Sequence, residues 1–108
     1  MDESELLKWI QDNSIKETVI ISGLRYFSNY VSSHPDQVKQ EFGQFDADLL
    51  SFQLAKISLT LKYHYPEDLV YISAYANVSY NKENIGSYQL VFDLNGEILD
   101  DFWSDFCD

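Results

Sequence analysis

Residues 69–92 read LVYISAYANVSYNKENIGSYQLVF, and two sets of side chains alternate along the first half of this stretch. The more apolar set is Ile72, Ala74, Ala76, Val78 and Tyr80. The other set is Tyr71, Ser73, Tyr75, Asn77 and Ser79. A period of two residues is typical of a β-strand that buries one face. We predict a strand here, a hairpin loop at NKEN (81–84), and a returning strand with Tyr88, Leu90 and Phe92 on one side.

A second hairpin is predicted at Asn95-Gly96, because both residue types tolerate the positive φ of a tight turn. The residues EIL (97–99) then form a final strand. Beyond them the large apolar residues recur at helical spacing: Leu99, Phe102, Trp103 and Phe106. We therefore expect the tail to close as a short helix over the sheet edge, with Leu99, Phe102 and Phe106 toward the core. In that helix Asp101 and Asp105, four residues apart, would stack on one face.

The first 43 residues show helical patterns. Asp2 and Glu5 have the spacing of a capping box, and the helix that they begin should end near Asn13. Ser14 and Glu17 form a second predicted box. The helix after it carries an apolar residue about every four positions: Ile15, Val19, Gly23 or Leu24, Phe27 and Val31. We expect helix here although the β-branched run TVII (18–21) weakens the pattern.

A third, short helix is predicted from Pro35, with Val38 and Phe42 facing inward and Gly43 ending it. Residues 46–56 fit either a helix or a strand, and a strand is favoured from about Lys56 onward. The chain thus reads as helices followed by a meander. We predict one α+β domain over residues 1–108, with N-terminal helices packed on one face of a three- to five-stranded antiparallel sheet built from residues 52–101.

The net charge is the outlier of the composition, with 18 acidic against 7 basic residues and a net charge of −11. Such a surface attracts basic proteins and repels nucleic acids and anionic membranes. No apolar run approaches the roughly 20 residues of a membrane span, and residues 1–13 lack the apolar stretch of a secretory signal. The lone Cys107 fits a reducing compartment. We expect a cytoplasmic protein.

Catalytic and metal-binding signatures are lacking in the sequence. His34 and His64 stand apart, whereas zinc needs about four ligands at short spacings. The paired carboxylates at 46/48 and 100/101 give no sign of the differing environments that acid–base catalysis requires. DLNGE (93–97) lacks the spacing of a calcium loop, and Cys107 lies too close to the end to be a convincing nucleophile. We expect no metal, no cofactor and no enzymatic turnover.

Aromatic side chains and segregated charge remain as functional signals. No Lys or Arg follows Lys82, while seven acidic residues do. Tyr71 and Tyr75 lie on the polar face of their strand, either as surface-packed tyrosines that cover neighbouring strands or as anchors for a partner. Tyr88, Phe92 and Phe102 are expected in the core. The candidate partner-binding residues are Tyr71, Tyr75, Asp100, Asp101, Trp103 and Asp105.

The segment VYISAYANVSYNKENIGSYQLVFDLNGEILDDFW (70–103) carries the pattern I-G-x-Y-x-L-x-F-D-x-x-G-x-I-x-D-D at 85–101. In this it resembles the C-terminal strands of small acidic immunity proteins of bacterial polymorphic toxin systems. The resemblance implies an inhibitor that binds one cognate, basic toxin domain, such as a nuclease, and blocks its active site. From the net charge we expect no direct contact with nucleic acid or membrane. We also expect a monomer or weak homodimer.

Two other classes of function stay open. A small-molecule-binding or enzymatic α+β domain would need a polar cluster facing inward, and the inward positions here are almost all apolar. A nucleic-acid mimic that blocks a DNA-binding protein would need carboxylates spaced like phosphates along one face, whereas the acidic residues here gather toward one end of the chain.

Overall fold

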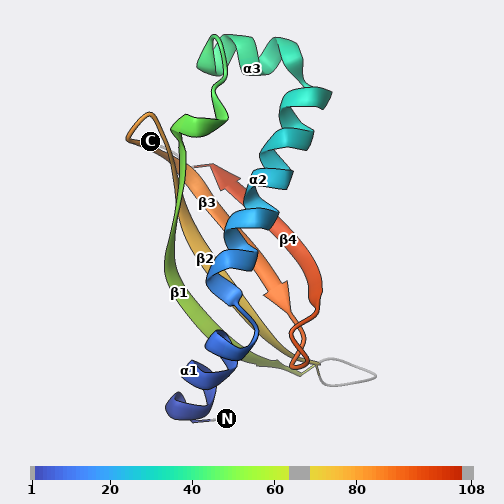
Figure 1. The fold of residues 1–108 in the computed structure, drawn as a ribbon. Coiled ribbons are helices and arrows are strands. Elements are labelled where there is room, and N and C mark those ends of the chain that lie inside the picture. Colours follow the sequence, from blue (N-terminus) through green and yellow to red (C-terminus); the bar gives the residue numbers. More distant parts are fainter. Residues whose placement is uncertain (1, 64–68, 106–108) are drawn as a thin grey trace.

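The computed structural model describes residues 2–63 and 69–105, so the predictions made for His64, Phe106 and Cys107 lie outside the described residues. Its helices are α1 (Glu3–Asp12), α2 (Ile15–Ser33) and α3 (Pro35–Phe42), and a 3₁₀ turn, η1 (Ala47–Leu49), follows them. The strands are β1 (Leu50–Lys62), β2 (Leu69–Tyr80), β3 (Glu83–Phe92) and β4 (Ile98–Asp105), which form one antiparallel sheet in the order β1-β2-β3-β4 (Figure 1). The predicted α+β meander with N-terminal helices is confirmed.

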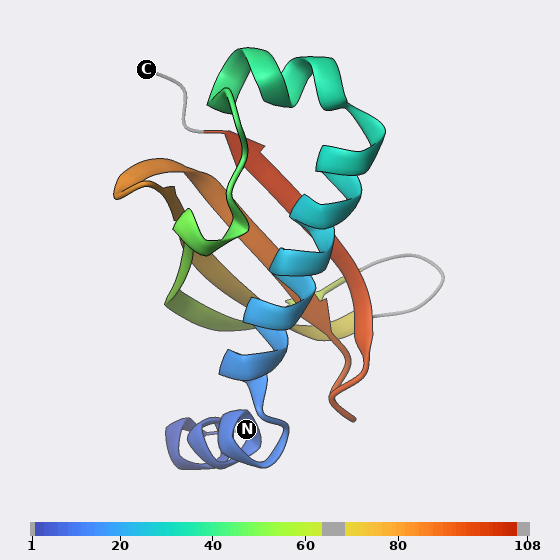
Figure 2. The same cartoon turned by 45° about the horizontal axis from the view of Figure 1, so that its top comes forward.

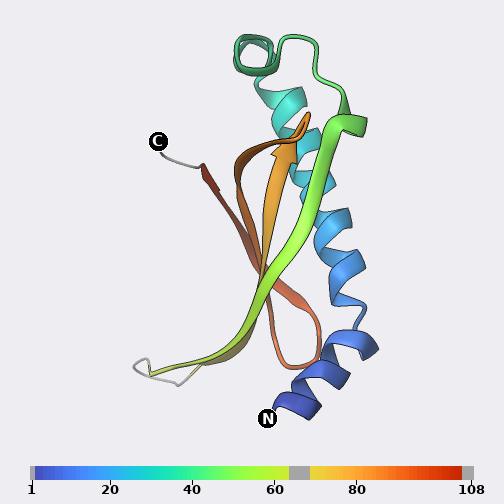
Figure 3. The ribbon, with the colours of Figure 1, turned by 90° about the vertical axis from the view of Figure 1, so that its left-hand side faces the viewer.

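The helices form one layer and the sheet forms the other. α2 runs diagonally across the sheet, with α1 at one end of it and α3 at the other (Figures 1 and 2). Seen edge-on, α1 and α2 lie on the same side of the strands, and α3 lies beyond the strand ends (Figure 3). We call this side the helix face; the opposite side, which no described helix covers, is the open face.

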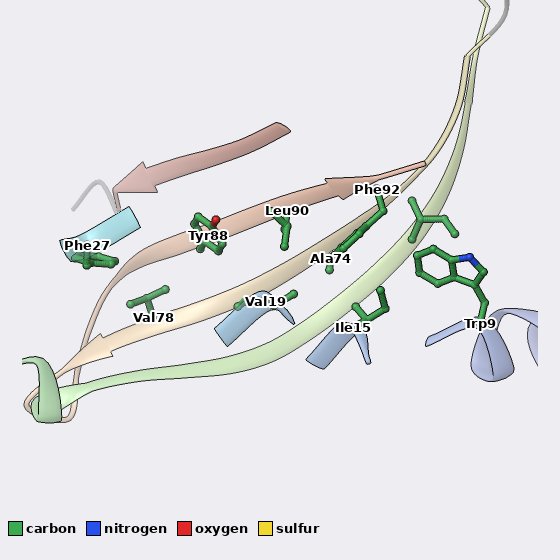
Figure 4. Packing of buried hydrophobic residues seen from close by; sticks show 11 residues of the cluster. Trp9, Ile15, Val19, Phe27, Ala74, Val78, Tyr88, Leu90 and Phe92 are labelled. Carbon is green, nitrogen blue, oxygen red and sulfur yellow. The ribbon is translucent and has the colours of Figure 1, made fainter. Parts of the chain in front are cut away.

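The core lies between α2 and the helix face of β2 and β3. The alternation predicted for these strands is confirmed, because the inward set is buried: Ile72, Ala74, Ala76, Val78, Tyr88, Leu90 and Phe92. From α2, Ile15 and Val19 point toward the small side chain of Ala74 (Figure 4). A Cβ at Gly23 would collide with the ring of Phe52, so glycine at this position lets the helix approach β1.

The two predicted capping boxes have different outcomes. The Asp2 carboxylate accepts a hydrogen bond from the Glu5 amide at 2.8 Å and caps α1 as expected. Ser14 does not cap α2, because its backbone is left-handed (φ 49°, ψ 47°) and its side chain makes no capping bond. An N-cap side chain reaches the first turn from an extended backbone. Here the chain instead turns sharply between two helices, and Thr18 Oγ1 donates to the Ser14 carbonyl oxygen at 2.8 Å.

The ambiguous segment 46–56 becomes the 3₁₀ turn followed by strand, which begins at Leu50 rather than near Lys56. A β-bulge between Leu54 and Lys56 explains the mixed pattern. The extra residue keeps Leu54 and Ile57, three positions apart, on the same face of the sheet, opposite Ala76 and Ala74. A spacing of three is also helical, so the bulge produces the apolar pattern of a helix within a strand.

The predicted C-terminal helix is wrong, since residues 98–105 form β4 along the edge of β3. Pairing with β4 satisfies the backbone hydrogen-bonding groups of β3 from Gly86 to Phe92. These hydrogen bonds outweigh the helical spacing of four apolar side chains. The strand period moves Phe102 out of the predicted core: it lies opposite Gln89 on the open face and is 49% exposed. Leu99 is likewise about half exposed.

Both predicted hairpins are present, with turn details that differ from the sequence pattern. The first loop is only Asn81-Lys82, and both residues have positive φ. In the second, Gly96 alone has positive φ. The Asp93 carboxylate organises that loop by accepting from the amides of Asn95 (2.9 Å) and Glu97 (3.0 Å).

Candidate partner-binding site

The sheet separates the six predicted partner-binding residues into two groups. Residues directly opposite each other in an antiparallel pair share a face. Trp103 lies opposite the buried Tyr88, so Asp101, Trp103 and Asp105 belong to the helix face. On the open face lie Tyr71, Tyr75 and Asp100. The single surface expected from the sequence is therefore two surfaces.

On the open face, Tyr75 is held by neighbouring strands. The Lys56 ammonium lies 4.5 Å from the centre of its ring, at cation–π distance. Gln89 Nε2 donates to the Tyr75 hydroxyl at 3.3 Å and to the Ser73 hydroxyl at 3.1 Å, which satisfies the buried Ser73. These contacts favour the interpretation of Tyr75 as a tyrosine that covers adjacent strands. Tyr71 is half-buried opposite Thr60.

On the helix face, a hollow of about 440 Å³ opens where α2, α3, β3 and β4 meet. This volume falls in the range of ligand-binding clefts. Two of the predicted residues, Trp103 and Asp105, line it. The other described lining residues are Tyr26, Phe27, Tyr30, Glu41, Phe42, Asn84 and Ile85. We call this site the acidic-aromatic hollow.

Residues of α2 and β4 build one wall of the hollow. Tyr26 and Tyr30 are four residues apart on α2 and therefore lie on one side of the helix. The Trp103 ring stacks on Tyr26 with centroids 6.2 Å apart, and it meets Phe27 edge-on at 5.1 Å. A Cβ at Gly86 would lie 2.5 Å from a Trp103 ring atom, so glycine at this position lets the indole lie across β3. The wall is thus set by packing before any ligand arrives.

The acidic groups of the hollow come from separate elements, Glu41 from α3 and Asp105 from the end of β4. Asp105 accepts a hydrogen bond from Trp103 Nε1 at 2.6 Å, which orients both side chains. Burial, followed by the charges of Glu41 and Asp105, raises the pKa of the Tyr30 hydroxyl. Among the described lining residues there is no Lys, Arg or His. The hollow is therefore negatively charged.

Asp101 has a structural partner beneath the hollow. The hydroxyl of the fully buried Tyr88 donates to Asp101 Oδ2 at 2.8 Å. Burial, and then the bond to this carboxylate, raises the pKa of Tyr88 far above its ordinary value. Asp101 and Asp105 also raise the pKa of Tyr26, after burial. Asp101 thus contributes negative charge near the hollow and satisfies a buried donor.

Sequence reasoning missed Tyr26, Tyr30, Glu41 and Phe42. Spacing within α2 relates the two tyrosines to each other, but no pattern relates them to residues more than seventy positions away on β4. Among the described residues, no group of three His, Cys, Asp or Glu side chains could hold a metal ion. Within the same part of the chain, no helix has the length and apolar character needed to cross a membrane.

Comparison with known protein families, with curated proteins and with solved structures finds no match in any of the three. The residues of the hollow and the pattern at 85–101 are therefore what supports a proposal of function.

Proposed function

We propose that this protein is an immunity-type inhibitor that acts in the cytoplasm. It binds a cognate, basic toxin domain through the acidic-aromatic hollow on the helix face, and it blocks the toxin's active site without any chemical step. The observation that carries the proposal is the hollow itself. Aromatic rings and two carboxylates from distant parts of the chain meet there, on a protein of net charge −11.

Each feature has a role in such binding. The negative field accelerates encounter with a basic partner, by roughly 10- to 1,000-fold in known cases. Aromatic groups such as Trp103 and Tyr26 provide area that is desolvated at the centre of an interface, where most binding energy resides. Carboxylates at the rim pair with cations of the partner and fix its orientation.

A second candidate function, the binding of a small cationic molecule, is favoured by the volume of the hollow. It would use the same aromatic and acidic residues. The alternative of a nucleic-acid mimic gains less support. A mimic needs a row of carboxylates along one face, whereas Asp100 and Asp101 lie on opposite faces of β4.

The test of the proposed function is co-expression with the protein encoded by the neighbouring reading frame. We expect cells that make the neighbour alone to stop growing, and cells that make both proteins to grow. The two proteins should then co-purify as a complex of fixed stoichiometry. A harmless neighbour, or one whose toxicity persists beside this protein, would contradict the proposal.

Two single substitutions locate the interface within that complex. Asp105→Asn, at the hollow, should slow association and flatten its dependence on salt. Asp100→Asn changes the charge by the same amount on the open face and serves as the matched control. Equal effects of the two substitutions on the association rate would place the interface elsewhere.

A further inference from the structure

The hollow has two properties that together narrow the chemistry of its ligand: its walls are aromatic and its charge is negative. Glu41 and Asp105 reach it from α3 and β4, and both influence the Tyr30 hydroxyl, so the carboxylates converge on one region. The aromatic residues there are Tyr26, Phe27, Tyr30, Phe42 and Trp103. A cation that can also pack against rings fits this combination.

The aromatic groups are held in place by contacts with other residues of the protein. Phe42 meets the Tyr80 ring at 4.7 Å between centroids. Tyr30 stacks on His34 at 5.0 Å, and Trp103 is fixed by Asp105. The rings and the Asp105 carboxylate are already oriented, so they lose little entropy when a ligand binds, which favours a preformed site.

The protein's own cations do not occupy this site in the described structure. Lys56 makes its cation–π contact with Tyr75, on the open face. Arg25 precedes Tyr26 on α2, but it does not line the hollow. The negative charge there is therefore available to a cation from outside.

Between the two common cationic side chains, arginine suits the hollow better than lysine. A guanidinium group is planar, stacks on aromatic rings, and presents several N–H donors to carboxylates, and it is less strongly hydrated than an ammonium group. A lysine ammonium can approach a ring or a carboxylate, but it loses more hydration when it leaves water.

We infer that the acidic-aromatic hollow is a receptor for a guanidinium group, supplied by one arginine side chain of the protein partner. The guanidinium stacks against the aromatic wall and donates hydrogen bonds to Glu41 and Asp105. The identity of the natural donor rests on the proposed function, whereas the chemistry of the site does not.

The test is a titration of the full chain with N-acetyl-arginine amide. Binding is monitored during the titration through the NMR signals of the two indole N–H groups. Trp103 lies in the hollow, while Trp9 is buried against Phe92 and donates to the Leu94 carbonyl, so Trp9 is an internal control. We expect the Trp103 signal to move with saturation and the Trp9 signal to stay. The lysine analogue and tetramethylammonium chloride should bind several-fold more weakly.

The double variant Glu41→Gln/Asp105→Asn should bind the arginine analogue about tenfold or more weakly, the change expected when charge-assisted hydrogen bonds are lost. The matched control is Glu3→Gln/Asp12→Asn, which removes the same charge from exposed positions of α1 at the far end of the molecule. If the double variant does not fold, Glu41→Gln alone carries the test, since it leaves in place the hydrogen bond that Trp103 Nε1 donates to Asp105.

The inference is overturned if the Trp103 signal does not move, if the three cations bind equally, or if the α1 control weakens binding as much as the hollow variant. Failure of the proposed function has a different signature. In that case arginine binds in the hollow, but the neighbouring protein is neither bound nor neutralised. The reverse result, in which the toxin is neutralised equally by wild type and by the hollow variant, overturns the inference that a partner arginine enters the hollow, and it leaves the inhibitor role in place with its interface elsewhere.

Discussion

Replacement of Asp101 by alanine tests whether a surface carboxylate holds a buried hydroxyl in place. Tyr88 is fully buried, and its hydroxyl donates to Asp101 Oδ2 at 2.8 Å. Without the carboxylate, this donor loses its hydrogen-bond partner, while the rest of the tyrosine stays buried. An unsatisfied buried donor costs about 1–3 kcal/mol, so we expect the free energy of unfolding to fall by that amount.

The companion substitution, Tyr88→Phe, removes the donor and keeps the ring. Asp101 is exposed and returns to water at little cost. The loss is then only the net value of one hydrogen bond, about 0.5–1.5 kcal/mol. In the double variant, Asp101→Ala should add almost nothing to Tyr88→Phe, because the donor that it would leave unsatisfied is already gone. Tyr63→Phe is the matched control, since Tyr63 is 79% exposed, and it should change stability very little.

The measurement is urea unfolding followed by circular dichroism, with the free energies compared at a common slope. The expected order of destabilisation is Asp101→Ala, then Tyr88→Phe, then Tyr63→Phe. If Asp101→Ala costs no more than the Tyr63 control, or if the losses at 88 and 101 simply add, then the hydrogen bond does not hold the tyrosine and the reasoning is refuted.

Three further predictions concern stability. Because the folded protein raises the pKa of Tyr26, Tyr30 and Tyr88, the contribution of these tyrosines to the free energy of unfolding should be fully present below about pH 10, the ordinary tyrosine pKa, and should be lost above it. In Tyr88→Phe the alkaline fall in urea unfolding should be shallower. Gly86→Ala would place a Cβ against the backbone carbonyl oxygen of Ser104 and 2.5 Å from the Trp103 ring, so it should cost about 1–3 kcal/mol and shift the Trp103 fluorescence. An unchanged spectrum and an unchanged stability would contradict this packing. Ser14→Gly should raise the free energy of unfolding by up to about 1 kcal/mol, measured by thermal or urea unfolding, because the Ser14 backbone is left-handed and glycine adopts that conformation without strain. If instead Ser14→Ala lowered the free energy of unfolding by about 1 kcal/mol, the Ser14 side chain would cap α2 as the sequence predicts.

The parts of the fold that sequence predicts well are those where one physical signal acts alone. On β2 and β3 the alternation of side chains coincides with burial, and Ile72 and Phe92 are found where the period of two places them. The start of α1 is likewise local, because Asp2 and Glu5 are in contact through a single turn. Such features need no knowledge of distant residues.

The failures occur where a distant partner decides the outcome. The bulge beside Leu54 gives a strand the apolar spacing of a helix, and only pairing with β2 reveals it. The apolar spacing around Phe102 predicts a helix, yet the free edge of β3 draws these residues into a strand. The hollow combines Glu41 with Asp105, and no local pattern connects residues from two elements that meet only in the folded chain.

The placement of β4 has a consequence for colloidal behaviour. In the described sheet this strand pairs only with β3, so its outer backbone groups offer a template for another chain. Three aspartates within its eight residues repel a second copy of the same strand at neutral pH. The net negative charge of the whole chain falls as pH approaches the isoelectric point near 4.3, and this repulsion weakens with it. Light scattering during acidification should therefore report self-association that begins at this edge, and Asp→Asn substitutions in β4 should move its onset toward neutral pH.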